Sequence, residues 1–588
     1  MSKQALIWGA QGAAVLALAA LPLPDFWITQ LNYIGLYSLT CLGLVLLTGV
    51  AGLTSFGQAA FVGIGAYASG WFTLNMGLSP WLTLFIGLAF TTASALLVGG
   101  ITLRMSGHYL PLATIAWALS LYYLMGNLDM LGKYDGLLGL PGLNVLGWDI
   151  GQGRGFFVLT WAMVLAAAAG LLFLLDSRAG RAMRSLRNGK LMAEAMGVNT
   201  LRYKIIIFVI AAQLASVSGW LFAHFQRSIN PSPFGLKMGI EYLFMSVVGG
   251  IGHVWGALTG AILTKLMEDQ LQVLLPKLIG TSGSYEVIVF GIVLVMMLKF
   301  LPDGIWSMVQ RKLPRPQRVA DWGQAPALAE RSKPAKGELV LDVKAIRKQF
   351  GGLTAVNNIS FQINAGQIVG LIGPNGAGKS TTFNLITGVL GLTSGDVVFR
   401  GDVVSGKPSR EIAQRGMSRT FQHVKMIPDM TVLENVALGA HLRGSKGVVS
   451  AMTRTNQMEE RQLFKEAQKQ LERIGMGQYL HEQAGNLAMG PQRLMEIARA
   501  LCSDPALLLL DEPAAGLRHK EKQSLGNVLR QLQAEGVSIL LVEHDMELVM
   551  DVCDHLVVME FGTLLTQGTP EQIQQDPKVR AAYLGTEH

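Results

Sequence analysis

Charged residues are scarce in the first half of this 588-residue sequence. Of 48 Lys and Arg residues and 40 Asp and Glu residues, only 16 and 10 fall in residues 1–301, and residues 26–103 contain none. Soluble domains carry about 25% charged residues throughout, so the sequence excludes a single soluble enzyme. The uncharged stretch is several times longer than the roughly 20 residues that one membrane-spanning helix needs. Residues 1–301 are therefore predicted to form a membrane domain.

Cysteine is also scarce. Cys41, Cys502 and Cys553 are too few and too widely spaced for a disulfide framework or a metal site, and we interpret them as small buried side chains. The formal charge of +8 does not indicate a nucleic-acid partner, because the membrane half contributes +6 of it in short segments between apolar runs. The positive-inside rule accounts for that distribution.

Ten apolar runs bounded by Gly, Pro or charged residues predict an all-α membrane domain of about ten segments. They lie near residues 5–21, 33–54, 56–76, 81–103, 109–128, 156–175, 205–226, 239–251, 254–272 and 284–301. The first run also has the outline of a secretory signal, but we favour a retained helix because the next apolar run follows closely.

The orientation of these segments follows from the basic residues. The loop after the sixth run carries seven of them between Arg178 and Lys204, which places it in the cytoplasm, and the polar connection 129–154 outside. After this loop, the long runs 205–226, 254–272 and 284–301 make only three crossings. The chain returns to the cytoplasm by Lys299 only if the number of crossings is even, so the run 239–251 is predicted to be a fourth, short or broken span. Close helix packing is the favoured interpretation of the Gly cluster at 249–252, and a place beside a water-filled path is the alternative.

Beyond the membrane domain, residues 302–337 are rich in Pro, Arg, Lys and Ala and are predicted to be a cytoplasmic linker. Residues 338–588 have the length of one further domain. An apolar strand at 368–372 is followed directly by a phosphate-binding motif of the type G-x-x-x-x-G-K-[ST], in which glycines turn backbone N–H groups toward the phosphates. The motif consists of Gly373, Pro374, Asn375, Gly376, Ala377, Gly378, Lys379, Ser380 and Thr381.

Within this motif, Lys379 is predicted to reach the β- and γ-phosphates and Ser380 to hold Mg²⁺. A second apolar strand, 506–510, ends in two carboxylates. Paired with the Lys379 loop, Asp511 is predicted to make the second Mg²⁺ contact and Glu512 to act as general base on the attacking water.

On these motifs, residues 338–588 resemble the ATP-binding subunit of an ABC transporter, an α/β P-loop NTPase that uses ATP and Mg²⁺. The resemblance implies that Gln422 in Arg419-Thr420-Phe421-Gln422 contacts Mg²⁺ and the water, and that His544 contacts the γ-phosphate. It also implies that Phe350 stacks on adenine, although the sequence alone equally allows a plain core Phe.

The signature motif of the family departs from its usual LSGGQ form. It is represented by Leu487, Ala488, Met489, Gly490, Pro491 and Gln492. In the family each ATP lies between the P-loop of one subunit and the signature of the other, so the resemblance implies a dimer of ATPase domains. Ala488 removes the hydroxyl that would reach the opposite γ-phosphate, and the loop that follows Glu512 ends in Arg518 instead of Asp or Asn. The site completed by this signature is therefore expected to turn over weakly.

The membrane half is similar to bacterial branched-chain amino acid permeases of the Liv type. The similarity lies in residues 52–67, 106–110 and 177–184, and in Glu194, Ala195 and Gly197, which resemble the coupling loop that rests on the ATPase. It implies a type II importer-like fold in lipid in the bacterial inner membrane, with the ATPase domain cytoplasmic. His108 departs from the acidic residue that is more usual there.

The resemblance as a whole implies a fusion of permease and ATPase in an importer for branched-chain or related amino acids, supplied by a periplasmic binding protein. Urea or short amides on the same scaffold, or an exporter half-transporter, are the alternatives. The partner is a second permease and ATPase, in a homodimer or a heteromer. The weak signature favours the heteromer slightly.

Overall fold

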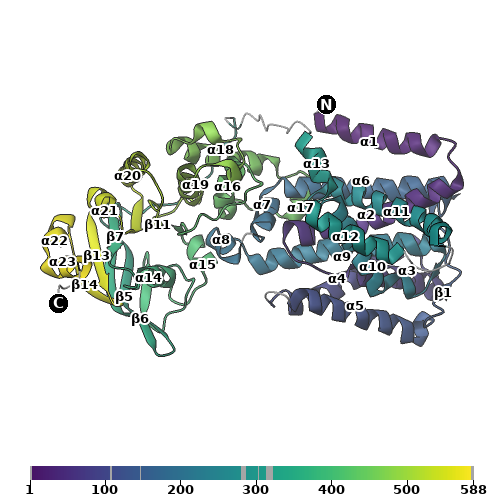
Figure 1. Ribbon diagram of the computed structural model, residues 1–588, viewed down its shortest axis with the longest axis horizontal. Helices are drawn as coiled ribbons and strands as arrows, with labels where there is room; N and C mark the ends of the chain where they lie inside the picture. Colours follow the sequence, from purple (N-terminus) through teal and green to yellow (C-terminus); the bar gives the residue numbers. More distant parts are fainter. Residues whose placement is uncertain are drawn as a thin grey trace. The chain divides into compact units, whose positions relative to one another are not determined.

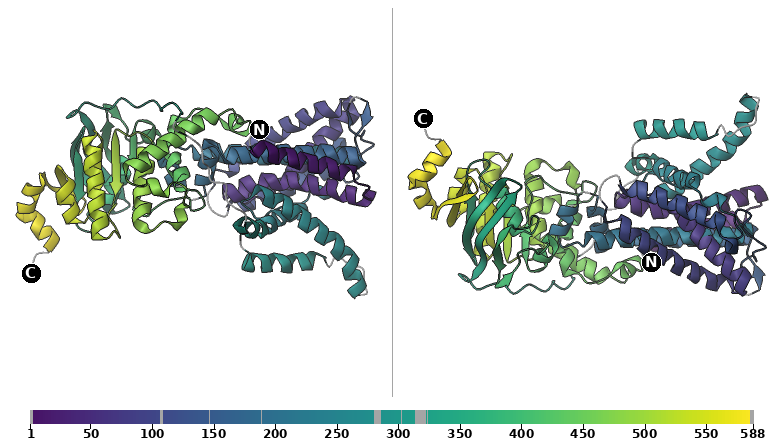
Figure 2. Two further views of the ribbon diagram at one scale, coloured as in Figure 1. Left: turned by 90° about the horizontal axis from the view of Figure 1, so that it is seen from above. Right: turned by 90° about the horizontal axis from the view of Figure 1, so that it is seen from below.

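The computed structural model describes residues 3–105, 109–145, 147–187, 189–279, 286–301, 303–312, 322 and 324–584 (Figures 1 and 2). The chain divides into two compact units. The first comprises Met1–Leu175 and Leu201–Pro316, and the second comprises Asp176–Thr200 and Gln317–His588. A segment from within the predicted membrane domain thus folds with the C-terminal unit. Ser106, Gly107 and His108 lie outside the described residues.

A helix forms at each of the ten apolar runs. These helices are α1 (Lys3–Ala20), α2 (Asp25–Leu44) continued by the π-helix η1 (Val45–Val50), α3 (Gln58–Met76), α4 (Pro80–Thr102), α5 (Tyr109–Asn127), α6 (Gly153–Leu175), α9 (Thr200–Gln226), α10 (Leu236–Gly249), α11 (Val254–Ile279) and α12 (Glu286–Phe300). Short elements connect them: η2 (Asp129–Leu131), η3 (Ser232–Phe234) and the strands β1 (Leu137–Leu138), β2 (Asn144–Val145), β3 (Trp148–Asp149) and β4 (Ser228–Ile229).

Not all of these helices are both long and apolar enough to cross a membrane alone. Among the described residues, five spans pass by length and composition: α2 with η1, α4, α5, α6 and α9. Helices α10 and α11 pass only as a pair, bent by 116° at their break. A helical, membrane-type domain is therefore confirmed, whereas ten separate crossings stay a prediction.

The predicted break at the glycine cluster is confirmed, and so is the close packing there. Helix α10 ends at Gly249, and Gly250 has φ +119. A Cβ on Gly249 would lie 1.8 Å from the carbonyl oxygen of Gly256, and one on Gly260 would lie 1.9 Å from that of Met245. Since no side chain fits at these distances, the small residues are what allow α10 and α11 to touch backbone to backbone.

The predicted linker is not wholly irregular. Helix α13 (Ile305–Lys312) lies within it and packs against α11 in the first unit. The composition of residues 302–337 hid this helix, because eight residues are too few to establish a helical period. The three cysteines are free and buried, as expected.

The second unit holds two sheets. The strands are β5 (Leu339–Phe350), β6 (Leu353–Asn364), β7 (Ile368–Ile372), β8 (Ser394–Phe399), β9 (Asp402–Val403), β10 (Met417–Arg419), β11 (Leu507–Asp511), β12 (Ser538–Val542), β13 (His555–Glu560) and β14 (Thr563–Gly568). One sheet is antiparallel, in the order β6-β5-β8-β9. The other has the order β10-β11-β12-β7-β13-β14 and is parallel except for its edge strand β14.

Helices and short turns complete the second unit. The α-helices of the second unit are α7 (Arg178–Ser185), α8 (Lys190–Ala195), α14 (Lys379–Ile386), α15 (Ser409–Gln414), α16 (Val432–Ala437), α17 (Val448–Met452), α18 (Gln457–Arg473), α19 (Met489–Leu501), α20 (His519–Ala534), α21 (Met546–Val552), α22 (Pro570–Gln575) and α23 (Pro577–Leu584). Its 3₁₀ turns are η4 (Leu438–Arg443), η5 (Gly477–Tyr479) and η6 (Ala484–Asn486).

The parallel sheet positions the site. All residues of β7, β11 and β12 are buried, as expected of parallel strands covered on both faces. The segments that follow β10, β11, β12 and β7 leave the sheet at one edge, where open α/β sheets place their ligands.

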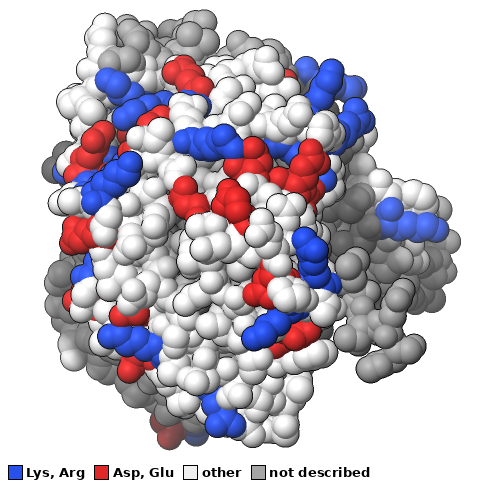
Figure 3. Space-filling view, turned by 90° about the vertical axis from the view of Figure 1, so that its left-hand side faces the viewer, with Lys and Arg blue, Asp and Glu red and all other residues white. Residues whose placement is uncertain are grey.

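On the face drawn in Figure 3, Lys and Arg side chains are interspersed with Asp and Glu instead of forming a patch of one sign.

Candidate functional site

The phosphate-binding motif follows strand β7, and α14 begins within it at Lys379. The ammonium group of Lys379 donates to the carbonyl oxygens of Gly373 (2.7 Å) and Pro374 (3.0 Å), and the side chain is buried. The motif thus folds back on itself around its own lysine, in the strand–loop–helix context that a phosphate cradle requires.

Two glycines of this loop are required by close backbone contacts. Gly373 has φ +151, and a Cβ there would lie 2.1 Å from the carbonyl oxygen of Met559 on β13. Gly378 has φ +93, and a Cβ there would lie 2.5 Å from the carbonyl oxygen of Ala355 on β6. Both conformations favour glycine, so the loop is held against its neighbouring strands at two points.

Asp511 supplies a carboxylate with spare capacity. It ends β11 and is 5% exposed, and its Oδ1 has no hydrogen-bond partner among the described residues. Burial raises the pKa of this carboxyl, with Arg419 opposing the shift. Burial also lowers the pKa of Lys379, and the negative charges of Glu512 and Asp511 oppose this shift. A buried carboxylate oxygen without a partner fits a hard divalent cation.

No larger metal cluster is present: the described residues contain no group of three or more His, Cys, Asp or Glu side chains that could hold a metal ion. Ser380, the other predicted metal ligand, is exposed in the first turn of α14.

The three predicted catalytic residues lie together. The amide Nε2 of Gln422 donates to Oε2 of Glu512 at 3.0 Å, and Nδ1 of His544 lies 3.6 Å from Oε1 of the same carboxylate. They come from the segments after β10, β11 and β12, which are adjacent parallel strands. Glu512 itself has φ +47, uncommon for a residue with a side chain, and its N–H donates to Val542 at 2.8 Å.

Two supporting residues were not predicted as part of the site. The carboxylate of Glu543, 1% exposed, accepts from the N–H groups of Ala514 (2.7 Å) and His544 (3.2 Å), and burial raises its pKa. It therefore joins the segment after Glu512 to the segment that carries His544. Its position one residue before the predicted histidine was the available signal.

Arg419 is the second supporting residue. Its Nη1 donates to Asn384 (2.9 Å) and Thr387 (2.6 Å), and its guanidinium carbon lies 4.6 Å from the ring centroid of Phe383. Burial lowers its pKa to about 10. These contacts fix α14 to β10, which precedes Gln422.

Phe350 ends β5 and is 45% exposed, with the ammonium of Lys348 at 5.0 Å from its ring centroid. The interpretation as a core Phe is therefore wrong. An exposed ring remains available to stack on a flat ligand.

The signature residues form a separate feature. Ala488 is the N-cap of α19 and makes no side-chain capping bond, while Nε2 of Gln492 donates to the carbonyl of Leu487 at 2.8 Å. A Cβ on Gly490 would lie 2.7 Å from a carboxylate oxygen of Glu521. Within the described part of the chain, no hydrogen bond or ion pair joins the signature to residues 373–381.

The segment Asp176–Thr200 contacts the ATPase-like fold through two arginines of α7. The guanidinium of Arg181, 1% exposed, lies 2.8 Å from Oε2 of Glu460 and 4.6 Å from the ring centroid of Phe464 on α18. Arg178 pairs with Glu459 (3.3 Å), and its Nη1 donates to the carbonyl of His441 (2.7 Å). Burial, reinforced by the two arginines, lowers the pKa of His441 to about 3.

The predicted coupling residues lie further along the same segment. Oε1 of Glu194 accepts from the hydroxyl of Thr200 at 2.9 Å, and Ala195 is buried. A Cβ on Gly197, which has φ +80, would lie 2.3 Å from the side chain of Leu442 in η4. Gly197 therefore touches the ATPase-like fold directly, while the ion pairs come from the arginines of α7.

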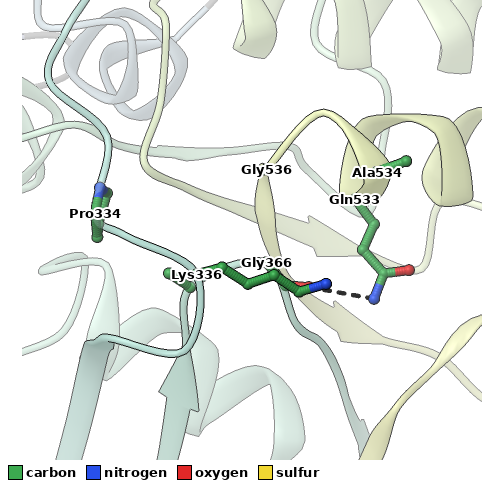
Figure 4. Close-up of a pocket in the computed structure, with 7 residues that line it drawn as sticks. Pro334, Lys336, Gly366, Gln533, Ala534 and Gly536 are labelled. Carbon is green, nitrogen blue, oxygen red and sulfur yellow. Dashed lines mark hydrogen bonds between the residues drawn. The ribbon is translucent and has the colours of Figure 1, made fainter.

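A hollow of about 300 Å³ lies elsewhere in the second unit (Figure 4). Pro334 and Lys336 line it from the predicted linker, and Gln533 lines it from α20 and donates to the carbonyl of Gly366 at 3.3 Å. None of its lining residues belongs to the predicted nucleotide site.

In the first unit, some buried polar side chains hydrogen-bond one another. Ser69 Oγ lies 2.7 Å from Thr83 Oγ1 and 3.0 Å from His224 Nε2, and His224 Nδ1 lies 2.9 Å from the carbonyl of Pro141. Gln58 is fully buried, and neither atom of its amide has a hydrogen-bond partner among the described residues.

Comparisons with known proteins match the two halves of the chain to different families. Residues 27–298 match the model of the permease component of branched-chain amino acid transport systems, residues 356–515 match that of ABC transporters, and residues 563–588 match that of branched-chain amino acid ATP-binding cassette transporters.

Individual relatives match the ATPase half. The high-affinity branched-chain amino acid transport ATP-binding protein LivG of Escherichia coli K12 is 44% identical over 249 residues, 42% of this chain and 98% of that protein. BraF of Pseudomonas aeruginosa is 41% identical over the same shares. A crystal structure of a nucleotide-free ATP-binding cassette is 32% identical and covers 42% of this chain and 99% of its own, with a TM-score of 0.38.

The permease match, the ATPase matches and the C-terminal match fall on one polypeptide. The second unit is accordingly an ABC ATPase that couples ATP hydrolysis to transport. The chain belongs to the branched-chain amino acid ABC transporter family, in which it joins a multi-pass membrane permease to a LivG-like ATPase.

Proposed function

We propose that the chain is the permease and ATPase half of a bacterial inner-membrane importer for branched-chain or related amino acids, which a periplasmic binding protein delivers. The observation that carries the proposal is that residues 176–200, which interrupt the permease, fold with the ATPase. The proposal assigns residues 1–301 to a type II importer-like permease, 302–337 to a linker, and 338–588 to the ATPase in the cytoplasm.

Nucleotide binding falls to the loop after β7 and to Phe350. The backbone N–H groups of residues 373–381 would surround the phosphates at the positive end of α14, and Lys379 would exchange its two carbonyl partners for phosphate oxygens. The exposed ring of Phe350 would stack on adenine.

Ser380, Gln422 and Asp511 would hold Mg²⁺. The unpartnered Oδ1 of Asp511 supports this assignment, since a cation would satisfy it. When bound, Mg²⁺ neutralises charge that develops on the phosphates.

Hydrolysis falls to Glu512, Gln422 and His544. Glu512 would accept the proton of the attacking water as general base, while Gln422 holds that carboxylate through its amide. His544 would donate to the γ-phosphate, and the buried Glu543 keeps the segments of Glu512 and His544 in register.

One chain supplies one P-loop, so a second ATPase would complete each site with its signature. In this chain the signature N-cap Ala488 has no hydroxyl to offer, and Pro491 stands in the same motif. We therefore propose that the site completed by Leu487–Gln492 hydrolyses ATP more slowly, in a homodimer or, preferably, a heteromer.

Uptake into proteoliposomes of radiolabelled leucine, isoleucine, valine and urea tests the function. The vesicles would hold ATP and the full-chain complex, with binding protein outside and the variant Glu512→Gln as matched control. We expect uptake of at least one amino acid that requires ATP and is lost in the control. Uptake of urea alone would establish the amide alternative, and no ATP-dependent uptake of any solute would refute the import proposal. The exporter alternative has less support because residues 27–298 match a branched-chain amino acid permease.

A further inference from the structure

The predicted linker makes specific contacts with the ATPase. Residues 322 and 324–336 run without helix or strand, and they lie outside all three ranges that match family models. A flexible tether would make few contacts. This stretch, here called the strap, instead bonds to the ATPase along its length.

The strap is fixed at one end by Arg331. Its backbone N–H donates to Oδ2 of Asp504 (2.6 Å), and its Nη1 donates to the carbonyl of Gln414 (2.8 Å). Lys333 lies 3.7 Å from the second oxygen of Asp504. Asp504 has φ +55 and lies in the turn between α19 and β11. This end of the strap is therefore bonded to the turn that leads into β11 and its catalytic carboxylates.

The middle of the strap contacts α18 and η4 through backbone carbonyls. The ammonium of Lys465 donates to Ala325 (2.7 Å), and Nη2 of Arg443 donates to Ala329 (3.1 Å). The guanidinium of Arg443 also lies 3.2 Å from Glu466 of α18, with both side chains buried. Hydrogen bonds from charged donors of this kind are stronger than neutral ones.

The other end shares one aromatic ring with the segment from the permease. Trp322 packs on Phe464 with 4.9 Å between ring centroids, and Arg181 of α7 lies 4.6 Å from the same ring. Phe464 is 1% exposed. Helix α18 thus carries the permease segment on its first turns and the strap on the turns that follow, with Phe464 common to both.

We propose that the strap positions α18 for the permease segment, so that residues 322 and 324–336 are a coupling element and Trp322 is a positioning residue for transport. Without Trp322, one side of Phe464 loses its packing, and the ring that supports Arg181 can tilt. Among the described residues, no hydrogen bond or ion pair joins the strap to the predicted ATP site. ATP hydrolysis therefore continues while less of it drives uptake. The inference rests on the proposed function, since a ratio of uptake to ATP hydrolysis requires that the chain imports a solute at the expense of ATP.

The test compares solute taken up per ATP hydrolysed in proteoliposomes that contain the full-chain complex. We expect Trp322→Ala to lower this ratio about two- to tenfold, the range of an aromatic contact, with ATP hydrolysis retained. Trp322→Phe should restore the ratio. Ser332→Ala, an exposed strap position, is the matched control and should match the parent.

The same assay separates the strap from the function on which it rests. A double-mutant cycle of Trp322→Ala with Arg181→Met should be non-additive, because both side chains act on Phe464. If Arg181→Met lowers the ratio but Trp322→Ala does not, the strap inference is overturned and the proposed function stands. A parallel loss of uptake and hydrolysis in Trp322→Ala that Trp322→Phe does not rescue would also overturn it, as a merely structural role. If Trp322→Ala fails to fold, Arg331→Ala at the far end of the strap takes its place, with the same expected fall and the same refuting result. If the parent shows no ATP-dependent uptake at all, the proposed function itself fails.

Discussion

Removing the charge of Glu460 should weaken the contact between the permease segment and the ATPase. The loss of stability should exceed that caused by breaking an exposed ion pair on the same helix. Glu460 accepts from the N–H of Arg178 at 2.5 Å and lies 2.8 Å from the guanidinium of Arg181, whose side chain is 1% exposed. The variant Glu460→Gln keeps the shape and leaves Arg181 buried without its counter-charge. Breaking a buried pair from one side costs about 3–5 kcal/mol, and the 13% exposure of Glu460 favours the lower end.

The matched control lies on α18 as well. Lys469 pairs with Glu330 at 3.5 Å, with side chains 61% and 74% exposed, so Lys469→Met should cost at most about 1 kcal/mol. Thermal unfolding of the purified full chain, followed by tryptophan fluorescence, measures the difference. At about 2–4 °C per kcal/mol for a domain of this size, Glu460→Gln should lower the transition by about 6 °C or more and the control by less than about 4 °C. Equal shifts for the two variants would show that burial does not govern the strength of this contact.

Three further outcomes are expected. Glu512→Gln should lower ATP hydrolysis by about 100-fold or more with ATP binding retained, measured by phosphate release and a fluorescent nucleotide; hydrolysis within threefold of the parent would exclude Glu512 as general base. Gly378→Ala should abolish nucleotide binding because its Cβ would lie 2.5 Å from a backbone oxygen, whereas Gly376→Ala, with nothing within 4 Å, should weaken it less; the reverse order in a binding titration would contradict the loop geometry. The pKa of His441 is lowered to about 3 in the folded chain, whereas the ordinary pKa of a histidine in the unfolded chain is about 6.5. Between these two pH values the unfolded chain binds a proton that the folded chain does not, so stability should fall as pH drops from 6.5 toward 3. His441→Asn should flatten that decline in thermal scans at pH 7 and 5, and an unchanged slope would argue against a neutral His441.

The sequence predicted which residues gather at one edge of the parallel sheet, because the motifs that carry them are local. Strand β7 and its loop are contiguous, and the carboxylates of Asp511 and Glu512 follow directly on an apolar strand. Parallel strands then bring their carboxyl ends to one edge, which places Gln422 beside Glu512 without further information. The exposure of Phe350 could not be predicted, since it depends on where β5 ends relative to the rest of its sheet.

The contacts of the permease segment were less predictable. The basic loop indicated the cytoplasmic side, but the partners of Arg178 and Arg181 lie about 280 residues away on α18, where many acidic residues could serve equally well. The strap was hidden for a different reason. Two of its hydrogen bonds are accepted by the backbone carbonyls of Ala325 and Ala329, so the side chains at these positions do not indicate them. Its proline-rich composition is also typical of an unattached linker.

The division of the chain gives the ATPase three peptide connections to the permease, not one. Residues 176–200 enter the second unit after α6 and leave it at α9, and the chain enters again after Pro316. Motion within the ATPase therefore acts on two membrane helices through covalent bonds. Proteolysis of the linker would cut one connection and leave a segment bounded by α6 and α9 in the ATPase fold. In a transporter of separate subunits, the corresponding contact can dissociate at low concentration; here the tether keeps the effective concentration of the ATPase high, so a modest docking energy is enough for one permease to keep one ATPase.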